Sequence, residues 1–381
     1  MEEKKIRIAL TMIVKNESHC IERCLESVFK SGLIDYFRIV DTGSTDNTIA
    51  VITKAFAQYG VDGEVVEMPF TNYADCRNFA LNGLDEICDY AFWIDADEQF
   101  EFSAGQDADS IKDKLKGKDA GFVKAIDGVT AFFRSSFFKL SPDIKWKGRV
   151  HEYVAGLAEE KSVTIDGCHI NVYQEGASWK GNIRAKQKRY LELLFEQHKE
   201  EPKEPRWVYF IADTYRNIRE PQFDKLAMDW YRKRIAMDDG SVEENYISRV
   251  MLASMQLRET GSANDSLLEG CGKIFDRGEH LLTLANYYQA KGMIDKSYRY
   301  SADMVKYFWN IPEGASMMID REVYFVVMPL THAYNCYLLG KKQDAQSAID
   351  YCVRALNNGI VTKQMNADAI KKLSAGIKEM K

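Results

Sequence analysis

Residues 90–101, "YAFWIDADEQFE", begin as a buried strand and end in four acidic residues. The apolar positions 91–94 run directly into Asp95, Asp97, Glu98 and Glu101. Side chains at positions i and i+2 of an extended chain face the same way, so Asp95 and Asp97 should share one side with Trp93. The pattern indicates either a solvated strand end or a carboxylate pair that holds a cation, with Glu98 and Glu101 as solvated acids.

Length and charge limit the class of protein. At 381 residues the chain exceeds one ordinary core, so two domains are expected. Its apolar fraction of 46% and charged fraction of 28% are those of a soluble globular protein. A net charge of −6 argues against nucleic-acid binding, but leaves room for a phosphorylated small molecule held with a metal. No apolar stretch approaches the ~18 residues of a transmembrane span.

The eight cysteines are scattered and none forms a CxxC pair, which favours free thiols in a reducing compartment, the cytoplasm. The start of the chain, "MEEKKIRIALTMIVKNE", has a short apolar run with no small-residue cleavage site. We therefore predict a first β-strand there and no signal peptide.

Strand and helix patterns alternate over the first ~100 residues. Strands are expected at 6–14, 36–41, 64–68 and 90–95, with helices between them opened by Ser18 and by Ser44 and Thr45. This order predicts an α/β fold, a Rossmann-like, mostly parallel or mixed sheet with helices on both faces. Ligands of such sheets bind beyond the carboxyl ends of the strands, which here are residues 15–17, 41–43 and 95–97.

The remainder changes character twice. Short aromatic and β-branched runs between 120 and 173 predict a smaller antiparallel or mixed sheet. Helices then fill the chain, and two sets of positions repeat with identical offsets: Ala285, Tyr288, Ser297, Ser301, Met304 and Ala333, Cys336, Ala345, Ile349, Cys352. This repeat is typical of tetratricopeptide (TPR) hairpins, and an irregular helical bundle is the alternative. We place an α/β domain at 1–178 and an all-α, TPR-like domain at 179–381.

The segment "IVDTGSTDNT", residues 39–48, ends a strand at Asp41 and turns at Gly43. A well-capped βα turn explains residues 44–46. It leaves Asp41 unexplained, whose carboxylate at that turn points into the crevice and can accept an N–H from a nucleotide base.

Four segments, "MIVKNE", "IVDTGSTDNT", "ADCRNFAL" and "WIDADE", resemble in order and spacing the family 2 glycosyltransferases of the GT-A fold. The resemblance covers residues 6–101 closely and extends loosely to about 175. It implies that the first-strand end lines the nucleoside, Asp41 binds the base and Arg77 approaches the base or diphosphate. Asp95 and Asp97 match the DxD motif, with Asp95 near the ribose and Asp97 on a divalent metal. The positions implied on the first-strand end are Thr11, Val14, Asn16 and Glu17.

A DxD pair has a physical purpose of its own. Two adjacent phosphates gain charge as a sugar leaves them, and Mn²⁺ or Mg²⁺ bound by few oxygen ligands can offset that charge. Trp93, on the same side as Asp95 and Asp97, should border the sugar.

A transferase also needs a general base, and "WKGRVHEYV", residues 146–154, is the expected place. Inverting transfer requires a carboxylate to take the acceptor's proton, and Glu152 is our candidate. Relatives with TPR-like tails carry a similar Gly-x-Val-His-Glu segment. The alternatives are Asp143 or Glu175 as base, with Glu152 an edge-strand acid paired with Arg149 or Lys147.

Two histidines and two cations complete the candidate site. In several GT-A enzymes a histidine beyond the base completes the metal shell, which points to His169. His151 is a second candidate ligand, or it orients Glu152 or contacts the acceptor. Lys180 and Arg184 begin a basic run that either closes over the diphosphate or forms a solvated helix face.

These observations and the resemblance together predict a metal-dependent, inverting glycosyltransferase that uses a nucleotide sugar, UDP-linked, on a peptide, protein or glycan acceptor. The helical domain should present that acceptor or mediate homodimerisation. One alternative is an inactive GT-A domain that serves as a binding module on the TPR-like scaffold. Another is a sugar nucleotidyltransferase, which would require a glycine-rich basic first loop that "KNESHC" lacks.

Overall fold

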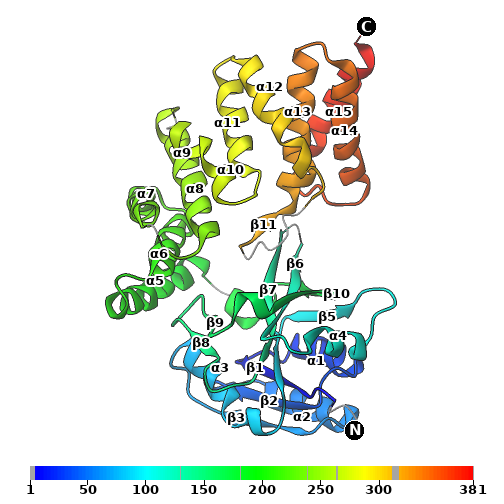
Figure 1. The fold of residues 1–381 in the computed structure, drawn as a ribbon, viewed down its shortest axis with the longest axis vertical. Helices are drawn as coiled ribbons and strands as arrows, with labels where there is room; N and C mark the ends of the chain where they lie inside the picture. The colour runs from blue at the N-terminus through cyan, green and yellow to red at the C-terminus, as the bar shows by residue number, and fades with distance from the viewer. Residues whose placement is uncertain are drawn as a thin grey trace. The chain divides into compact units, whose positions relative to one another are not determined.

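The computed structural model describes residues 5–128, 130–180, 182–237, 239–262, 265–310 and 317–380, which fall into two compact units (Figure 1). The described residues up to 128 and from 132 to 200 form the first unit, and 130–131 with 201–380 form the second. Compactness therefore places the helix after residue 182 in the first unit. The functional division between 178 and 179 stays a prediction.

The first unit confirms the predicted α/β class by alternating strands with helices. Its elements are β1 (Ile8–Val14), α1 (Ile21–Lys30), β2 (Tyr36–Asp41), α2 (Thr48–Tyr59), β3 (Gly63–Glu67), α3 (Tyr73–Leu81), β4 (Tyr90–Trp93), β5 (Glu98–Phe102), α4 (Ala108–Leu115), β6 (Ala120–Asp127), β7 (Thr130–Lys139), β8 (Lys145–Lys147), β9 (Tyr153–Ala155), β10 (Ser162–Val172) and α5 (Ile183–Glu200).

One mixed sheet organises this unit, in the strand order β3-β2-β1-β4-β7-β6-β10-β5. β1 pairs in parallel with β2 and with β4, and β2 pairs in parallel with β3. β7 runs antiparallel to β4, and β5 runs antiparallel to β10. The carboxyl ends of β2, β1 and β4 therefore meet at one edge, where the predicted nucleotide-binding segments that follow these strands lie.

The two faces of the sheet bury two separate cores, as the alternation of side chains along β1 requires. Ile8, Leu10 and Met12 pack in a core shared with α1, α2 and α4, whereas Ala9 packs in a core shared with α3 and the β8–β9 hairpin. Helix α1 buries Ile21, Cys24, Leu25, Val28 and Phe29, a spacing that places one apolar stripe against the sheet.

Two expectations about strands are wrong. The strands between 120 and 173 do not form a sheet of their own, because β7 joins β4 with Phe137 and Phe138 opposite Phe92 and Ala91. Strands β8 and β9 form a separate two-stranded sheet. The acids after β4 also do not end the strand region, since β5 begins at Glu98 and pairs with β10.

The helix caps differ from the expectation as well. Helix α2 begins at Thr48 and has Asn47 at its N-cap position, where the Asn47 side chain makes no capping hydrogen bond. Of the residues 44–46 expected to cap it, Asp46 accepts the Thr48 N–H through Oδ1 at 3.0 Å, whereas Ser44 and Thr45 bind Asn16 in the loop after β1. Helix α1 begins at Ile21, and Ser18 instead donates its N–H to Asp46 Oδ2 at 3.2 Å.

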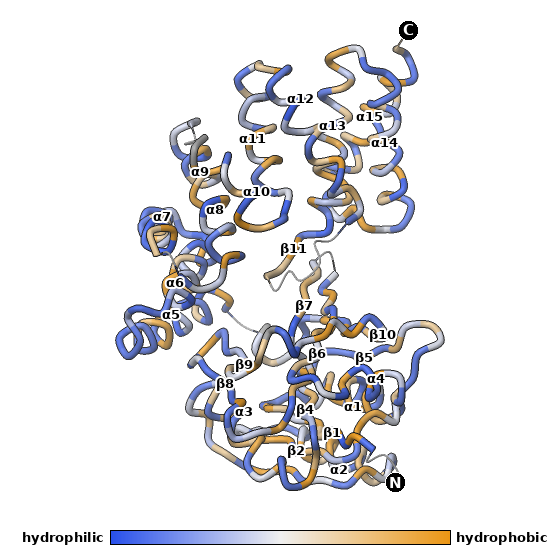
Figure 2. The backbone as a smooth tube through the Cα atoms, in the orientation of Figure 1, coloured by the Kyte–Doolittle hydropathy of each residue, from blue (hydrophilic) through white to orange (hydrophobic). Residues whose placement is uncertain are grey.

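The second unit is helical apart from a short strand, as predicted. Its elements are α6 (Pro205–Ile218), α7 (Pro221–Ala236), α8 (Val242–Thr260), α9 (Asp265–Glu269), α10 (Cys271–Ile274), α11 (Glu279–Ala290), α12 (Ile294–Asp303), β11 (Ile319–Asp320), α13 (Met328–Leu338), α14 (Lys342–Asn357) and α15 (Gln364–Glu379). The helices alternate between hydrophilic and hydrophobic colours along their length (Figure 2), as amphipathic packing requires.

Buried small side chains join these helices into hairpins. The positions that repeat in the sequence lie in the hairpins α11–α12 and α13–α14, and each of them is buried: Ala285, Tyr288, Ser297, Ser301 and Met304 in one, Ala333, Cys336, Ala345, Ile349 and Cys352 in the other. Ser297 Oγ donates to the carbonyl of Ala285 at 2.8 Å within the first hairpin. Asn335 Nδ2 donates to Ser297 Oγ at 2.8 Å and connects the second hairpin to the first.

All eight cysteines are buried and free, as the scattered spacing predicted. Among the described residues, no helix has both the length and the apolar character needed to cross a bilayer.

The β8–β9 hairpin carries the predicted base, Glu152. Gly156 follows β9 and packs closely against the backbone just before β8. Gly156 has φ +89°, and a Cβ there would lie 2.3 Å from the backbone oxygen of Asp143. We expect Gly156→Ala to destabilise the protein by ~2–4 kcal/mol, because backbone strain adds to the steric clash. Melting temperatures measure the loss.

Gly105→Ala is the matched control, since Gly105 has φ +77° but open space around its Cβ position. It should lower the melting temperature less. Equal losses in the two variants would contradict the close approach.

Candidate active site

The carboxyl ends of β1, β2 and β4 bring the predicted nucleotide-binding segments together. Val14 lies opposite Asp41 in the β1–β2 register, and Thr11 lies opposite Trp93 in the β1–β4 register. Loops that follow adjacent parallel strands share one edge of the sheet. The sequence-based placement of these segments at one crevice therefore matches the arrangement of the strands.

Asp41 is 2% exposed, and its two carboxylate oxygens have different surroundings. Oδ2 accepts the N–H groups of Gly43 at 3.0 Å and Ser44 at 2.9 Å, which accounts for the turn. Oδ1 is buried without a hydrogen-bond partner in the described part of the chain. Buried carboxylate oxygens are normally satisfied, so Oδ1 is suited to accept an N–H from a ligand.

The loop after β1 is held by the loop after β2. Asn16 has φ +59°; its N–H donates to Ser44 Oγ at 2.9 Å, and its Oδ1 accepts the Thr45 N–H at 2.7 Å. The Glu17 N–H donates to Thr48 Oγ1 at 2.7 Å. Ser44 and Thr45 therefore fix the position of the first loop, which explains why they do not cap α2.

Thr11 and Val14 are buried in the sheet. Thr11 Oγ1 lies 3.5 Å from the Phe92 carbonyl oxygen. The Val14 side chain belongs to the core shared with α1 and α2, and its carbonyl accepts from the N–H and Oγ1 of Thr42 at 2.8 and 3.0 Å. Val14 therefore contributes its backbone to the crevice, through the carbonyl group that binds Thr42.

Arg77, on α3, is the charge around which the site is assembled. It is 6% exposed, and its Cζ lies 4.6 Å from the Trp93 ring centroid and 4.9 Å from that of Trp146. Its Nη2 donates to Asp95 Oδ1 at 2.9 Å and its Nε to Glu152 Oε1 at 2.8 Å. Burial alone would lower the pKa of Arg77, but the two carboxylates outweigh it and raise the pKa.

The two aspartates of the DxD pair differ. Burial would raise the pKa of Asp95, but Arg77 and then Arg134 outweigh it and hold the pKa below its ordinary value. Burial raises the pKa of Asp97, and the Gly176 N–H, which donates to Asp97 Oδ2 at 2.9 Å, offsets this only in part. Asp95 is therefore a paired anion, and Asp97 is a carboxylate short of positive charge.

Glu17 lies beside Asp97, and its carboxylate likewise has a raised pKa and accepts a backbone N–H. The Ala177 N–H donates to the Glu17 carboxylate at 3.1 Å, and burial raises the Glu17 pKa. The consecutive backbone N–H groups of Gly176 and Ala177 thus bind the two carboxylates. Buried Asp97 and half-buried Glu17, side by side with raised pKa values, form a donor set that a hard cation would suit.

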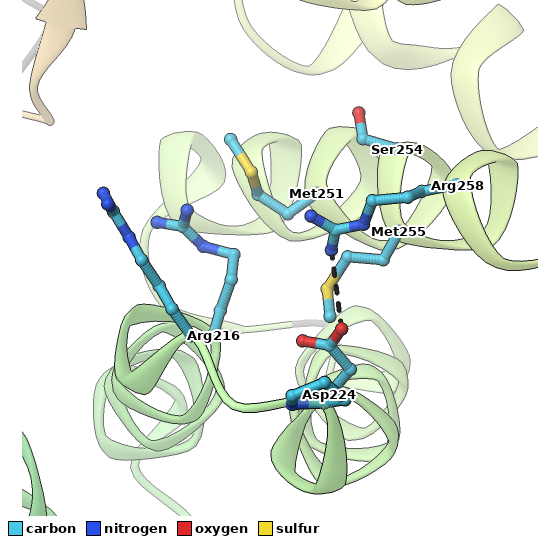
Figure 3. A pocket seen from close by; sticks show the side chains of 8 residues that line it. Arg216, Asp224, Met251, Ser254, Met255 and Arg258 are labelled. Atoms are coloured by element: carbon cyan, nitrogen blue, oxygen red, sulfur yellow. Dashed lines mark ion pairs between the residues drawn. The ribbon is translucent and has the colours of Figure 1, made fainter. Parts of the chain in front are cut away.

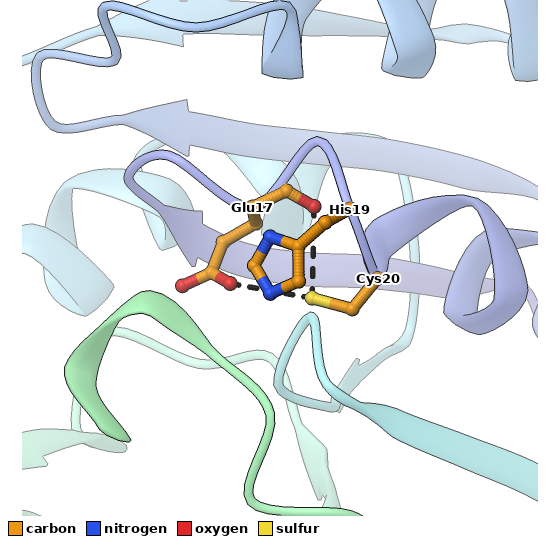
Figure 4. A group of neighbouring side chains, drawn as sticks. All are labelled: Glu17, His19 and Cys20. Carbon is orange, nitrogen blue, oxygen red and sulfur yellow. Dashed lines mark hydrogen bonds between the residues drawn. The ribbon is translucent and has the colours of Figure 1, made fainter. Parts of the chain in front are cut away.

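Glu17, His19 and Cys20 bring their ligand atoms within 4.8 Å of one another (Figure 4). His19 Nε2, however, lies 2.8 Å from the carbonyl oxygen of Glu175. Burial raises the pKa of the Cys20 thiol well above its ordinary value, and the thiol donates to Glu17 Oε2 at 3.3 Å. These contacts are those of a hydrogen-bonded thiol beside the acid pair.

Glu98 corrects the expectation of a solvated acid. It is 2% exposed, and the Arg134 guanidinium binds both its oxygens, with Nη1 to Oε1 at 2.8 Å. Oε2 also accepts the Asp95 N–H at 2.9 Å, and the Arg134 Cζ lies 4.1 Å from the Trp93 ring centroid. Glu98 and Arg134 therefore position the start of the DxD turn, and Trp93 lies between two guanidinium groups.

Glu152 pairs with Arg77, not with Arg149 or Lys147. Its side chain is 13% exposed, and Oε2 accepts no hydrogen bond from the described residues. Arg149 is engaged elsewhere, since its Nη2 donates to Glu200 Oε1 at 2.6 Å. The ion pair of Glu152 is therefore made within the site, with Arg77.

Aromatic side chains lie near Glu152. Burial raises the pKa values of Tyr73 and Tyr190, and the Glu152 charge contributes to the rise. His151 has φ +53°, and its ring meets the Tyr190 ring edge-on with centroids 5.6 Å apart. The Tyr190 and Tyr73 hydroxyls lie 3.3 Å apart. Tyr190 comes from α5, so this helix forms part of the wall of the site within the first unit.

His169 lies on β10 opposite Glu101, and its Nε2 is 3.4 Å from Glu101 Oε2. Glu101 is four residues beyond Asp97, which on a strand spans about 13 Å. The structure brings Asp97 to Glu17 and leaves His169 on Glu101, so a shared metal stays a prediction.

The basic run after Trp179 contains a candidate that the sequence analysis missed. Lys180 and Arg184 are exposed. Lys186 is half-buried: burial lowers its pKa, Asp97 partly offsets the effect, and its Nζ lies 5.5 Å from the Tyr190 ring centroid. The i, i+4 spacing of Lys186 and Tyr190 on a helix was the available signal.

Residues 10–107 match the model of glycosyl transferase family 2, so this part of the chain is a family 2 glycosyltransferase domain. The matched range contains Asp41, Arg77, Asp95 and Asp97 and ends before Glu152.

Two relatives and one structure resemble the chain further. The SPbeta prophage-derived glycosyltransferase SunS of Bacillus subtilis (strain 168) is 25% identical over 247 residues, 60% of this chain and 53% of SunS. A TPR repeat-containing protein of Synechococcus elongatus is 29% identical over 153 residues, 39% of this chain and 35% of that protein. This chain spans about half the length of SunS. The structure of S. aureus TarS 1-349 with UDP-GlcNAc covers 94% of this chain and 93% of that chain, at 12% identity and a TM-score of 0.35, too low to carry an inference.

The Glu98–Arg134 ion pair should contribute to stability, because both of its side chains are largely buried. Arg134→Gln leaves a 2%-exposed carboxylate without its partner, and we expect a loss of about 3–5 kcal/mol. Replacing both residues, Arg134→Gln with Glu98→Gln, should restore part of that loss. The shifts in melting temperature of Arg134→Gln, of Glu98→Gln and of the double variant measure the coupling.

Lys54→Gln is the control, because the Lys54–Glu22 pair at 3.3 Å has side chains 72% and 62% exposed. It should cost less than about 1 kcal/mol. A loss in Arg134→Gln no greater than that of the control would contradict a positioning role.

Proposed function

We propose that the chain is a metal-dependent, inverting glycosyltransferase that moves a sugar from a UDP-sugar to a peptide, protein or glycan acceptor. The observation that carries the proposal is the unpaired, buried Oδ1 of Asp41 at the edge where β1, β2 and β4 end. An acceptor oxygen there complements the ring N–H that uracil offers. Asn16 lines the same crevice, beside the turn that Asp41 caps.

Asp97 is the proposed metal ligand, with Glu17 beside it. Burial raises the pKa of each, and a divalent cation would remove that cost. Mn²⁺ or Mg²⁺ held there would offset the charge that develops on the departing diphosphate. His169 stays a candidate ligand, although its contact with Glu101 gives that role no support.

Asp95 and Arg77 have separate tasks in this proposal. Asp95 keeps its charge next to Arg77 and is placed to accept a ribose hydroxyl. Arg77 holds Asp95 and Glu152 in one network, so the donor half of the site is fixed relative to the base. Trp93, between Arg77 and Arg134, gives the sugar side of the crevice a rigid border.

Glu152 is the proposed general base. Arg77 holds Oε1, which leaves Oε2 to take a proton from the acceptor hydroxyl or thiol. The acceptor atom forms its bond to the anomeric carbon, the bond from that carbon to the diphosphate oxygen breaks, and the nucleoside diphosphate leaves with the electron pair. His151, Tyr73 and Tyr190 form an aromatic group beside the base, and the Glu152 charge adds to burial in raising the pKa values of the two tyrosines.

Lys186 joins Lys180 and Arg184 as a candidate for binding the diphosphate, and its half-burial and nearness to Asp97 favour it. The eight buried free thiols support a location in a reducing compartment, which for this proposal is the cytoplasm. The helical unit is proposed to present the acceptor or to mediate homodimerisation.

Hydrolysis of UDP-sugars tests the proposal without a known acceptor. With Mn²⁺ present, the protein should release UDP from at least one of UDP-glucose, UDP-galactose and UDP-N-acetylglucosamine. Glu152→Gln should lower kcat by about 10²–10⁴ and leave KM within a few-fold, because it removes the base and keeps a hydrogen-bond acceptor for Arg77.

Asp143→Asn serves as the control, since Asp143 is an exposed acid just before β8. Its kcat should equal that of the unchanged protein. A lower kcat in Asp143→Asn with an unchanged kcat in Glu152→Gln would assign the role of base to Asp143. Absence of UDP release from all three UDP-sugars would contradict transfer activity.

A further inference from the structure

The second unit contains a hollow that no part of the proposed transfer reaction uses. It opens where α6 ends and α7 begins, against one side of α8, with a volume of about 390 Å³ (Figure 3). Ligand pockets typically occupy about 300–1,000 Å³. The size alone therefore permits a side-chain-sized ligand or a few residues of a chain.

Three arginines line the hollow: Arg216, Arg219 and Arg258. Arg216 is neutralised locally, because its Nη2 donates to Asp213 Oδ1 at 2.7 Å. Arg258 is 67% exposed and reaches Asp224 only at 3.8 Å, as the dashed line in Figure 3 marks. Arg219 is exposed and forms no ion pair with the described residues. The hollow thus has guanidinium donors with little anionic charge opposite them.

Helix α8 supplies the two methionines of the hollow, on the same stripe as Arg258. Met251, Met255 and Arg258 follow at i, i+4 and i+7, so they face the same side of the helix. Met255 is buried and Met251 is half-buried. Methionine side chains adapt to ligands of different shape, which suits a surface that receives an apolar side chain.

We propose that this hollow binds a short acidic peptide segment with an interspersed aliphatic side chain. Carboxylates of the segment would pair with Arg219 and Arg258, and the aliphatic side chain would lie on Met251 and Met255. Guanidinium groups bind carboxylates through paired N–H donors, which makes arginine well suited to this recognition. The described lining residues include no aromatic side chain on which a base could stack, which disfavours a nucleic-acid strand as the occupant.

Fluorescence anisotropy with the full chain tests the proposal. The probe is a fluorescein-labelled hexapeptide, Glu-Glu-Leu-Glu-Glu-Leu, compared with Gln-Gln-Leu-Gln-Gln-Leu. We expect the acidic peptide to bind and the glutamine peptide to bind at least about tenfold more weakly. Added salt should weaken binding of the acidic peptide, because its ion pairs with Arg219 and Arg258 would be partly exposed to solvent.

The double variant Arg219→Gln with Arg258→Gln should weaken binding by about tenfold or more. Both side chains are exposed, so the circular dichroism spectrum and melting temperature should not change. Arg232→Gln is the matched control, an exposed arginine of α7 paired with Asp229 outside the hollow, and it should bind as the unchanged protein does.

Three outcomes would overturn the proposal. The first is no binding of the acidic peptide, and the second is equal affinity in the double variant and the control. The third is a single-stranded oligonucleotide that binds more tightly than the peptide with the same dependence on Arg219 and Arg258. None of these readouts requires transferase activity, so failure of the proposed function would leave the test valid.

Discussion

The buried guanidinium of Arg77 is the interaction on which the site depends. A buried charge packed against two indole rings must be neutralised by nearby carboxylates, since burying it unpaired would cost several kcal/mol. Asp95 at the end of β4 and Glu152 on the β8–β9 hairpin supply that charge from segments far apart in the sequence. The same contacts that stabilise Arg77 thus fix the distance between the proposed ribose-binding acid and the proposed base.

Surroundings, more than residue type, separate the roles of the acids. Asp95 and Glu98 each have an arginine partner, whereas the carboxylates of Asp97 and Glu17 accept backbone N–H groups. Asp41 is satisfied at one oxygen and not at the other. An acid that is paired with an arginine, as Asp95 and Glu98 are, stabilises the local structure. An acid without such a partner among the described residues, such as Asp97, Glu17 or Asp41, is available to bind a cation or the N–H of a nucleotide base.

Sequence patterns predicted the parts of this arrangement that local periodicity determines. The apolar run into Asp95 placed β4 correctly, and the repeated small residues placed the helical hairpins, because both signals lie within one or two elements. Long-range pairing was not predictable in this way. The antiparallel addition of β7 to β4, the strand β5 and the burial of Glu98 against Arg134 all depend on residues 36 or more positions apart. Lys186 was missed because only the packing of α5 within the first unit reveals its half-burial.

Calorimetric titration with UDP, with and without Mn²⁺, tests the central claim most directly, since it measures recognition of the base and the diphosphate apart from any acceptor. The account predicts binding that tightens when Mn²⁺ is present, an Asp97→Asn variant that loses this metal dependence, and an Asp41→Asn variant that binds more weakly in both conditions. UDP affinity that is absent, or that neither Mn²⁺ nor these two replacements alter, would contradict it.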